Sequence, residues 1–320
     1  MTRSFFITGA AGCVGLALLE RLAVAGMAAI GMDLSPRPPD CPASASWVRG
    51  DLLDTASYEG ALQGVHTVVH LAAKVHAAPD TQEDAASFFR VNVEGTRNVL
   101  GAAARKGVRK FLFVSTVAVL AAPAENITDS YAESKRAAEN AVLDEARRLG
   151  VVIARPATVY GPRDRGNVYR LIRWIDRGLP PVIGPGTNRK SMVFVCTLAE
   201  ALLFLAERGE GSRAYVVTDG KDLSMNEIAA TIARSLGRRN LWPEIPLSVA
   251  KAVAGINEWM AERTGAPRLL RREVVEKMAE ETVYDPLDLF SLGFSPAVDV
   301  EEGIAEAVAW YRHSVQSRSV

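Results

Sequence analysis

A glycine-rich segment between an apolar run and a helical pattern constrains the fold of this chain more than any other feature. The segment 8–15 reads TGAAGCVG, and it directly follows the apolar residues 5–7. Gly9 permits a tight turn, Gly12 lets a phosphate group approach the backbone, and Gly15 lets the following helix pack closely on the strand. The N-terminus of that helix would face the phosphates. The segment therefore predicts a strand, a turn and a helix that together bind a dinucleotide.

Short apolar runs alternate with amphipathic stretches through the first half of the chain. The runs predict strands at 4–8, 28–32, 47–48, 67–70, 110–115 and 151–154, and the stretches predict helices at 14–25, 85–105 and 131–149. Such alternation indicates a parallel sheet with helices on both faces. After residue 161 the pattern changes to loops rich in Pro and Gly, with helices predicted at 168–177, 198–208, 224–236, 248–264 and 300–311.

These patterns predict an α/β fold in two parts. We expect a doubly wound parallel sheet of the Rossmann type in residues 1–165, which would bind the cofactor. A smaller, helix-rich C-terminal lobe in residues 166–320 would bind the substrate, and some of its segments would return to the sheet.

Composition and charge exclude several classes of protein. Lys plus Arg and Asp plus Glu both number 37, so no basic surface for nucleic acid is indicated. The three cysteines and four histidines lack the spacing of a disulfide framework or a metal site. The N-terminus is unlike a signal peptide, and no apolar stretch reaches the roughly 18 residues of a membrane span. We therefore expect a cytoplasmic protein with no metal, no nucleic-acid partner and no membrane partner.

Tyr131 precedes Lys135 by about one helical turn in a stretch predicted to be helical. Residues four apart lie on the same face of a helix. An ammonium group near a phenol stabilises the phenolate and lowers the pKa of the tyrosine from about 10. Such a phenol can exchange a proton with a hydroxyl group while a nicotinamide exchanges a hydride. The spacing alone is common, but downstream of the glycine-rich segment it predicts a catalytic pair.

Two acidic residues follow predicted strands where the adenosine half of a dinucleotide would lie. Asp33 comes directly after the second apolar run, and a carboxylate there accepts hydrogen bonds from ribose hydroxyls and repels a 2′-phosphate. The nearest arginine is Arg37, beyond Pro36, so the sequence favours NAD over NADP. Asp51 follows the third run and is a candidate for the adenine amino group, or else belongs to an ordinary loop before a helix.

With these features together, the chain resembles the extended short-chain dehydrogenase/reductase family, the NAD-dependent epimerases and dehydratases, over essentially its full length. The further matching motifs are HLAA at 70–73, VNVEGT at 91–96, FVST at 113–116, RPATVYGP at 155–162 and LGFSP at 292–296. Within the family it is most similar to the nucleotide-sugar 4-epimerases of surface-polysaccharide pathways. The segments that carry this similarity are 70–76, 165–180, 184–195 and 215–229.

The resemblance implies roles for individual residues. The catalytic residues would be Thr116, Tyr131 and Lys135, with Ser115 as the hydroxyl partner if the register shifts by one residue. The NAD cofactor would be bound by Gly9, Ala11, Gly12, Cys13, Val14, Gly15, Asp33, Asp51, Leu52, Leu71, Ala72, Ala73, Asn92, Val114, Tyr131, Lys135 and Pro156. Asn92 would also brace the catalytic helix. The substrate would be contacted by Lys74, Ser115, Thr116, Thr158, Asn167, Val168 and Lys190.

A homodimer is also implied, because family members usually pair through two long helices. In this chain those helices are the ones predicted at 85–105 and 131–149. The apolar residues of their faces include Phe88, Phe89, Val93, Val142 and Leu143.

The resemblance favours a 4-epimerase of UDP-hexose type that works through a 4-keto intermediate. The alternative is a dehydrogenase or reductase of a sterol-like, sugar or other secondary alcohol, which would use the same Thr, Tyr and Lys. A 4,6-dehydratase is disfavoured because Val117 and Ala118 follow Thr116 where dehydratases usually have an Asp-Glu pair. A protein that binds NAD without catalysis is disfavoured by the intact set of three residues.

Two departures from the epimerase pattern leave the substrate open. The second basic residue that usually holds the diphosphate has no clear match, and Arg271, Arg272 and Lys277 are the candidates. The segment 182–184 reads VIG where these epimerases often stack an aromatic residue on uracil. Both departures concern the substrate, and neither affects the cofactor.

Overall fold

The computed structural model describes residues 3–75, 82–121, 130–145, 149–209, 211–239, 245–264 and 272–316. The chain forms two compact units, and neither is continuous in sequence. Unit 1 consists of Met1–Ala157, Val195–Thr218 and Asp285–Ala297, and unit 2 consists of Thr158–Phe194, Asp219–Tyr284 and Val298–Val320. The first unit therefore includes two segments from the second half of the chain.

Unit 1 is built on a parallel seven-stranded sheet with the strand order β10-β6-β5-β4-β1-β2-β3. The strands are β1 (Ser4–Thr8), β2 (Ala28–Asp33), β3 (Ser46–Arg49), β4 (Thr67–His70), β5 (Lys110–Val114), β6 (Gly150–Pro156) and β10 (Arg213–Val217). The order reverses beside β1, as it does in doubly wound nucleotide-binding folds. The α/β Rossmann-type prediction is thus confirmed. The apolar pattern had not predicted β10 as a strand.

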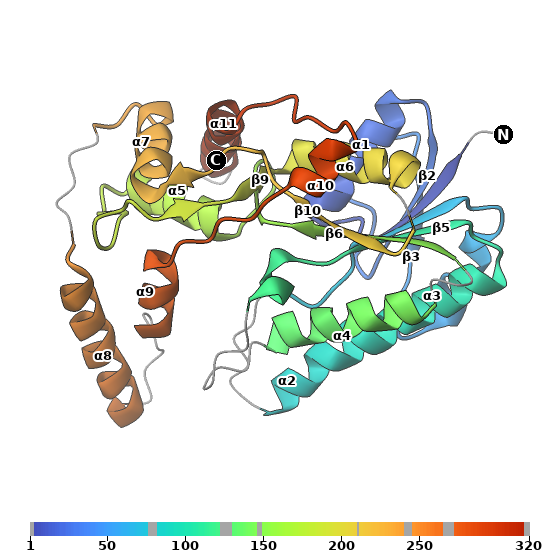
Figure 1. Ribbon diagram of the computed structural model, residues 1–320, viewed down its shortest axis with the longest axis horizontal. Coiled ribbons are helices and arrows are strands. Elements are labelled where there is room, and N and C mark those ends of the chain that lie inside the picture. The colour runs from blue at the N-terminus through green and yellow to red at the C-terminus, as the bar shows by residue number, and fades with distance from the viewer. Residues whose placement is uncertain are drawn as a thin grey trace. The chain divides into compact units, whose positions relative to one another are not determined.

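Helices cover both faces of this sheet (Figure 1). They are α1 (Cys13–Val24), α2 (Gln82–Phe89), α3 (Gly95–Arg105), α4 (Ser130–Asp144), α6 (Val195–Arg208) and the short α10 (Leu287–Ser291), with 3₁₀ turns at Thr55–Ser57, Glu59–Leu62 and Val117–Leu120. Apolar side chains of α3 and α4 pack on one face, against Phe6, Val68 and Phe111 of the sheet. Helices α1 and α6 contact each other on the opposite face.

Lys110 joins the returning helix α6 to the start of β5. Its ammonium donates to the carbonyl oxygens of Leu205, Ala206 and Gly209 at 3.1, 2.9 and 3.0 Å. These carbonyls lie at the C-terminal end of α6, where a positive charge is favoured. Burial lowers the pKa of Lys110. The contact joins segments about 95 residues apart in the sequence.

The helix predicted at 85–105 is interrupted by a π-helical turn. The turn η3 (Arg90–Glu94) separates α2 from α3, and the Gly95 N–H donates to the Arg90 carbonyl. A single π turn is usually found where a helix serves a site. It contains Asn92, which is 1% exposed. The prediction of one regular helix was wrong at this point. The π turn holds one extra residue, so the positions after it are displaced around the helix from the regular α-helical spacing.

Unit 2 contains two small sheets and most of the remaining helices. Its elements are β7 (Thr158–Tyr160), α5 (Asn167–Asp176), β8 (Arg189–Lys190), β9 (Met192–Phe194), β11 (Leu223–Ser224), α7 (Met225–Ser235), α8 (Leu247–Thr264), α9 (Arg272–Ala279) and α11 (Val300–Gln316). The pair β7 and β9 is parallel, and the pair β8 and β11 is antiparallel. Helix α7 begins with a capping box formed by Ser224 and Glu227, as the sequence pattern of a helix start requires.

A buried polar cluster anchors β7 in unit 2. The Tyr160 hydroxyl donates to Asp219 Oδ2 at 2.8 Å, and the Asp219 carboxylate accepts from the Phe194 N–H at 2.9 and 3.1 Å. A Cβ at Gly303 would meet the Tyr160 hydroxyl at 2.6 Å, so α11 approaches this cluster without a side chain between them. Within the described residues, no helix has the length and apolarity needed to cross a bilayer.

Candidate active site

The glycine-rich turn of unit 1 has no room for side chains at its first and third glycines. Gly9 has a φ of 70°, and a Cβ there would lie 2.7 Å from the backbone nitrogen of Ala72. A Cβ at Gly15 would lie 2.6 Å from both the Ala10 Cα and the Gly9 carbonyl oxygen. Gly12 is exposed and precedes the first residue of α1. The turn therefore has the close packing and the open middle glycine that the sequence predicts.

The N-terminus of α1 offers a site for an anion. No side chain caps this helix, and its first turn, which begins with Cys13 and Val14, contains no acidic residue. An uncapped helix N-terminus attracts negative charge through its N–H groups and its dipole. Asp33, at the end of β2, accepts from the Ala11 N–H at 3.1 Å and from the Ser35 N–H at 3.0 Å. The turn, the helix end and this fixed carboxylate fit the pyrophosphate and ribose of a dinucleotide.

The other predicted cofactor residues lie at the ends of neighbouring strands. Leu71 and Ala72 follow β4, and their N–H groups donate to the Thr8 carbonyl and hydroxyl oxygens, both at 3.2 Å. The Asp51 side chain stabilises the loop in which it lies, because it accepts a hydrogen bond from the Leu53 N–H at 2.9 Å. The remaining positions are Leu52, buried in the core, Ala73 after β4, Val114 at the end of β5 and Pro156 at the end of β6.

Lys135 is buried at the centre of unit 1. It is 2% exposed, and its ammonium donates to the Val114 carbonyl at 2.7 Å and lies 4.6 Å from the centre of the Phe113 ring. Burial lowers the pKa of Lys135 to about 7, against an opposing effect of Glu139. A lysine in this state readily changes its charge near neutral pH. Such pKa shifts are common among catalytic residues.

Tyr131 lies one turn before Lys135 on α4, and a hydrogen-bonded chain fixes this turn. The Ser134 hydroxyl donates to the Tyr131 carbonyl at 2.8 Å, and the Asn92 amide donates to the Ser134 hydroxyl at 2.9 Å. Asn92 also exchanges hydrogen bonds with the backbone of Lys74 at 2.7 and 3.2 Å. The π turn therefore braces α4 through Asn92, in the role that the family resemblance implies for this residue.

The Tyr131 ring is half-buried beside Phe88 of α2. The two rings meet edge to face with centroids 6.5 Å apart. The Lys74 ammonium lies 5.1 Å from the centre of the Phe88 ring and donates to the Ser87 hydroxyl. Helix α2 thus supports the ring of Tyr131 from one side.

Two hydroxyl side chains follow β5. The Thr116 hydroxyl oxygen accepts from the Ala118 N–H at 3.2 Å, which leaves its O–H to donate. Ser115 is 4% exposed, and its hydroxyl has no hydrogen-bond partner among the described residues. A buried hydroxyl without a partner costs free energy unless a ligand or water satisfies it. Both positions therefore remain candidates for the hydroxyl that contacts the reacting oxygen.

His70 connects the glycine-rich turn with the π turn through buried hydrogen bonds. Its Nδ1 lies 2.7 Å from the Thr8 hydroxyl, and its Nε2 lies 2.9 Å from the Thr96 hydroxyl. The Thr96 hydroxyl donates to the Asn92 carbonyl at 2.6 Å, so it accepts from His70 Nε2. Burial lowers the pKa of His70 and so keeps the ring neutral, which means that Nε2 carries the proton and Nδ1 accepts from the Thr8 hydroxyl.

Acid should destabilise the protein through this histidine. Burial lowers the pKa of His70 from 6.5 to about 3. Between these values the unfolded chain binds more protons, so the free energy of unfolding falls as the pH falls below 6.5. At pH 5 the loss is about 2 kcal/mol. Urea unfolding at pH 7 and at pH 5 gives the free energy of unfolding at each pH. Its decrease between the two should be smaller by this amount in His70→Gln than in the wild-type protein, because glutamine does not titrate. Equal drops in both proteins would contradict a neutral His70.

The predicted substrate residues of the C-terminal lobe lie on three elements of unit 2. Thr158 is exposed at the start of β7, and Asn167 is exposed at the first position of α5. The Val168 side chain is buried, with 5% exposure. Lys190 is half-buried in β8, and its ammonium donates to the Glu280 carbonyl.

The candidates for the second basic residue that an epimerase would use to hold a diphosphate are not among the described side chains. Arg271 lies outside the described residues, and the structure describes no side-chain position for Arg272 or Lys277. Burial lowers the pKa of Lys190, while Glu280 and Glu281 oppose this effect. A diphosphate at Lys190 would therefore compete with acidic neighbours of the same unit.

The sequence reasoning missed several residues that hold the site. They are Thr8, Thr96 and Ser134, which complete the hydrogen-bonded chains, and the pair Arg155 and Glu139. The Arg155 guanidinium binds the Glu139 carboxylate at 3.0 and 2.6 Å and so joins β6 to α4. A signal was present for most of them, because Thr8, Thr96 and Arg155 all belong to the conspicuous motifs. Within the described ranges, no cluster of His, Cys, Asp or Glu could hold a metal ion.

Comparisons with known proteins identify the family of the chain. The model of the NAD dependent epimerase/dehydratase family matches residues 5–218. An Escherichia coli O157:H7 protein, N-acetyl-alpha-D-glucosaminyl-diphospho-ditrans,octacis-undecaprenol 4-epimerase, is 29% identical over 95% of this chain and 94% of its own length. A 3-beta-hydroxysteroid dehydrogenase from Mycolicibacterium neoaurum is 27% identical over 95% of this chain and 90% of its own.

The fold is similar to that of solved members with a bound cofactor. The UDP-glucose 4-epimerase of Thermus thermophilus in complex with NAD aligns with a TM-score of 0.73 at 26% identity, and covers 97% of this chain and 99% of its own. The similarity thus extends through both units. Because the family model also spans the glycine-rich turn, the Tyr-Lys pair and the returning strand β10, this chain belongs to the NAD dependent epimerase/dehydratase family, the extended short-chain dehydrogenase/reductases, and is an NAD-dependent enzyme.

Proposed function

We propose that the protein is a 4-epimerase of a sugar carried on a diphosphate, of UDP-hexose type, acting through a 4-keto intermediate. The observation that carries the proposal is the Tyr131-Lys135 turn, held in place by Asn92 and Ser134 within the unit that contains the glycine-rich turn. The E. coli relative is named as a sugar 4-epimerase, and so is the T. thermophilus structure. Both names describe a sugar on a diphosphate.

In this proposal Tyr131 removes the proton of the C4 hydroxyl group, and Thr116 or Ser115 donates a hydrogen bond to the same oxygen. NAD, held at the glycine-rich turn, would supply reversible hydride transfer at C4. The 4-keto sugar rotates so that its other face is reduced, and Tyr131 returns the proton to the C4 oxygen. The reaction therefore has no net oxidation. Lys135, with its pKa near 7, adjusts the charge beside the phenol.

The proposal is tested by a reaction without added cofactor. The purified protein should interconvert UDP-glucose and UDP-galactose, or their N-acetylated forms, with no change in NADH absorbance. Proton NMR of the sugar would follow the change at C4. An epimerase also retains its NAD, so extraction of the purified protein should yield nearly one NAD per chain. No epimer from any of these sugars, together with NADH produced from an alcohol, would contradict the proposal.

The second candidate is a dehydrogenase or reductase of a secondary alcohol. The observation that favours it is the setting of Lys190, which bonds within its unit beside acidic residues. The Mycolicibacterium relative, named as a steroid dehydrogenase, is nearly as similar in sequence as the E. coli epimerase. The reaction above separates the two, because only a dehydrogenase produces a net change in cofactor.

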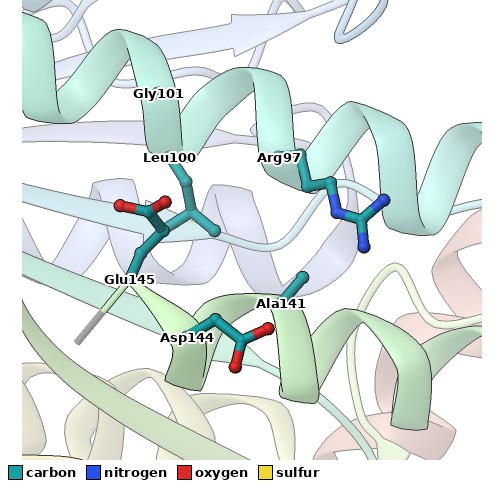
Figure 2. A pocket seen from close by; sticks show the side chains of 6 residues that line it. All are labelled: Arg97, Leu100, Gly101, Ala141, Asp144 and Glu145. Carbon is teal, nitrogen blue, oxygen red and sulfur yellow. The ribbon is translucent and has the colours of Figure 1, made fainter.

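We also propose a homodimer through the two long helical stretches, the first formed by α2, the π turn and α3 and the second by α4. Of the five apolar residues that were expected at this interface, Phe88, Val93 and Val142 are buried in their own unit, and only Phe89 and Leu143 are exposed, at 40% and 39%. A hollow of about 250 Å³ lies between the two helices. Figure 2 shows Arg97 from α3 and Asp144 and Glu145 around it. In a two-fold pair, such opposite charges can meet across the axis.

Light scattering should therefore report twice the 34.4 kDa of one chain. Leu143→Asp should shift the protein towards the monomer, because it places a charge on the apolar part of the interface. Leu179→Asp is the matched control, since Leu179 is 38% exposed and lies in unit 2. A wild-type mass of one chain at micromolar concentration would overturn the dimer.

A further inference from the structure

One helix of unit 2 has an unusual number of exposed apolar side chains. Sixteen large apolar residues are exposed among the described residues, and five of them lie on α8. These five form the α8 stripe: Val249, Val253, Ile256, Trp259 and Met260, which are 50%, 52%, 59%, 53% and 50% exposed. Their spacings of three and four residues place them on one side of the helix. Single exposed apolar residues are ordinary, but a continuous stripe indicates a binding surface.

The opposite side of α8 is fixed within its own unit. Ala250 and Ala254 are buried with Val275 of α9, and Ile183 and Ile245 pack against this cluster. Lys251 forms an ion pair with Glu276 of α9 at 2.7 Å. The helix therefore has two apolar sides. One consists of small residues and is covered by α9 and by Ile183 and Ile245. The other is the α8 stripe, which faces away from α9.

The charged groups of α8 are arranged around the stripe. The Arg263 guanidinium lies 4.2 Å from the centre of the Trp259 ring, at the C-terminal end of the stripe. Glu258 and Lys251 are seven residues apart and fall on the side of the helix that faces α9. The stripe thus ends in a tryptophan and an arginine. This combination is typical of helices at a membrane surface, where the indole lies among the lipid headgroups and the guanidinium meets lipid phosphates.

The area of the stripe is small for a contact between two copies of the chain. A stable interface uses roughly 20–30 residues on each partner and buries about 1,200–2,000 Å² in total. The stripe supplies five residues, only one of them aromatic. A bilayer surface needs no matching shape, and it covers an 18-residue helix along its whole length.

We propose that the α8 stripe lies in the surface of an anionic lipid bilayer. A helix held there by its apolar side keeps unit 2, and with it the enzyme, at the membrane surface. The lack of a spanning segment, from which no membrane partner was expected, does not exclude a helix that lies on the bilayer surface.

The test is flotation of the purified full chain with two kinds of vesicle. One contains phosphatidylethanolamine and phosphatidylglycerol, and the other contains phosphatidylcholine alone. The wild-type protein should float with the anionic vesicles, and Val253→Glu/Ile256→Glu should bind them at least tenfold more weakly. Arg263→Gln should lose most of the preference for anionic lipid. The matched control is Val24→Glu on α1, because Val24 is 83% exposed in unit 1. Circular dichroism and melting temperatures would confirm that each variant is folded.

The outcomes separate this inference from the proposed function, since flotation requires no turnover. Flotation that depends on the stripe supports the membrane contact even if no sugar is epimerised. Epimerisation of a soluble UDP-sugar by a protein that never floats would overturn the membrane contact and leave the function intact. Equal binding by the stripe variant and Val24→Glu would also overturn it. The membrane contact would also be overturned if the wild-type protein did not float and the stripe variant changed from dimer to monomer. The stripe would then bind a second copy of the chain.

Discussion

Replacing Tyr131 with phenylalanine should lower the turnover number by roughly 10² to 10⁴, the usual contribution of a positioned acid or base. The half-buried ring should keep its edge-to-face contact with Phe88, and the Ser134 hydrogen bond goes to the backbone of residue 131 and not to its side chain. NAD content and melting temperature should therefore stay at wild-type values. Steady-state kinetics with the UDP-sugar, beside a cofactor extraction, would measure both.

Tyr58→Phe provides the control for the loss of a phenolic hydroxyl in unit 1. Tyr58 is 1% exposed, and its hydroxyl donates to the Leu52 carbonyl at the long distance of 3.5 Å. This variant should retain almost full activity. Near-normal turnover in Tyr131→Phe would remove Tyr131 from the mechanism, whereas an equal loss in both variants would point to a general effect on folding.

Gly15→Ala should weaken NAD binding and lower the melting temperature together. The added Cβ would lie 2.6 Å from backbone atoms of Ala10 and Gly9, so α1 must move away from the turn that would bind the phosphates of NAD. Overfilling a closed position costs about 1–3 kcal/mol. If this free energy destabilises only the NAD-bound protein, the affinity for NAD drops by about 5- to 150-fold. Calorimetric titration of the cofactor-free protein with NAD would measure the change.

Gly60→Ala is a suitable comparison, since a Cβ at Gly60 would meet no atom within 4 Å and its backbone is not left-handed. It should bind NAD as the wild-type protein does. Unchanged affinity in Gly15→Ala would mean that the turn can widen at little cost. The close approach of α1 to the glycine-rich turn would then not be required for binding.

Local patterns predicted the sheet of unit 1 well, because each buried parallel strand is a short apolar run next to a turn. Six of the seven strands were predicted in this way. The seventh, β10, reads RAYVV and contains an apolar run like the others, but it lies in the half of the chain whose Pro- and Gly-rich pattern did not indicate the sheet. Its place beside β6 follows from pairing between distant segments, and no local pattern contains that information.

The candidate site shows the same division between local and distant information. Gly9, Gly15, Tyr131 and Lys135 could be named from the sequence, since their spacing itself expresses the geometry. The hydrogen bonds from Thr8 through His70 to Thr96 could not, because they join residues up to 62 positions apart. The π turn was also invisible, since it alters the backbone and not the residue types. The state of Lys135 depends on its burial, which only the folded sheet provides.

Unit 1 consists of three separate segments of the chain, and this affects how it folds during synthesis. The outer neighbour of β6 is β10, and the partner of α1 on the sheet is α6, so both arrive from the segment Val195–Thr218. A ribosome adds about 5–20 residues per second, so several seconds separate the release of β6 from that of β10. During this interval the nascent chain exposes an open strand edge and the apolar face of α1. The nucleotide-binding unit, although it begins at the N-terminus, is among the last parts of the chain to be completed.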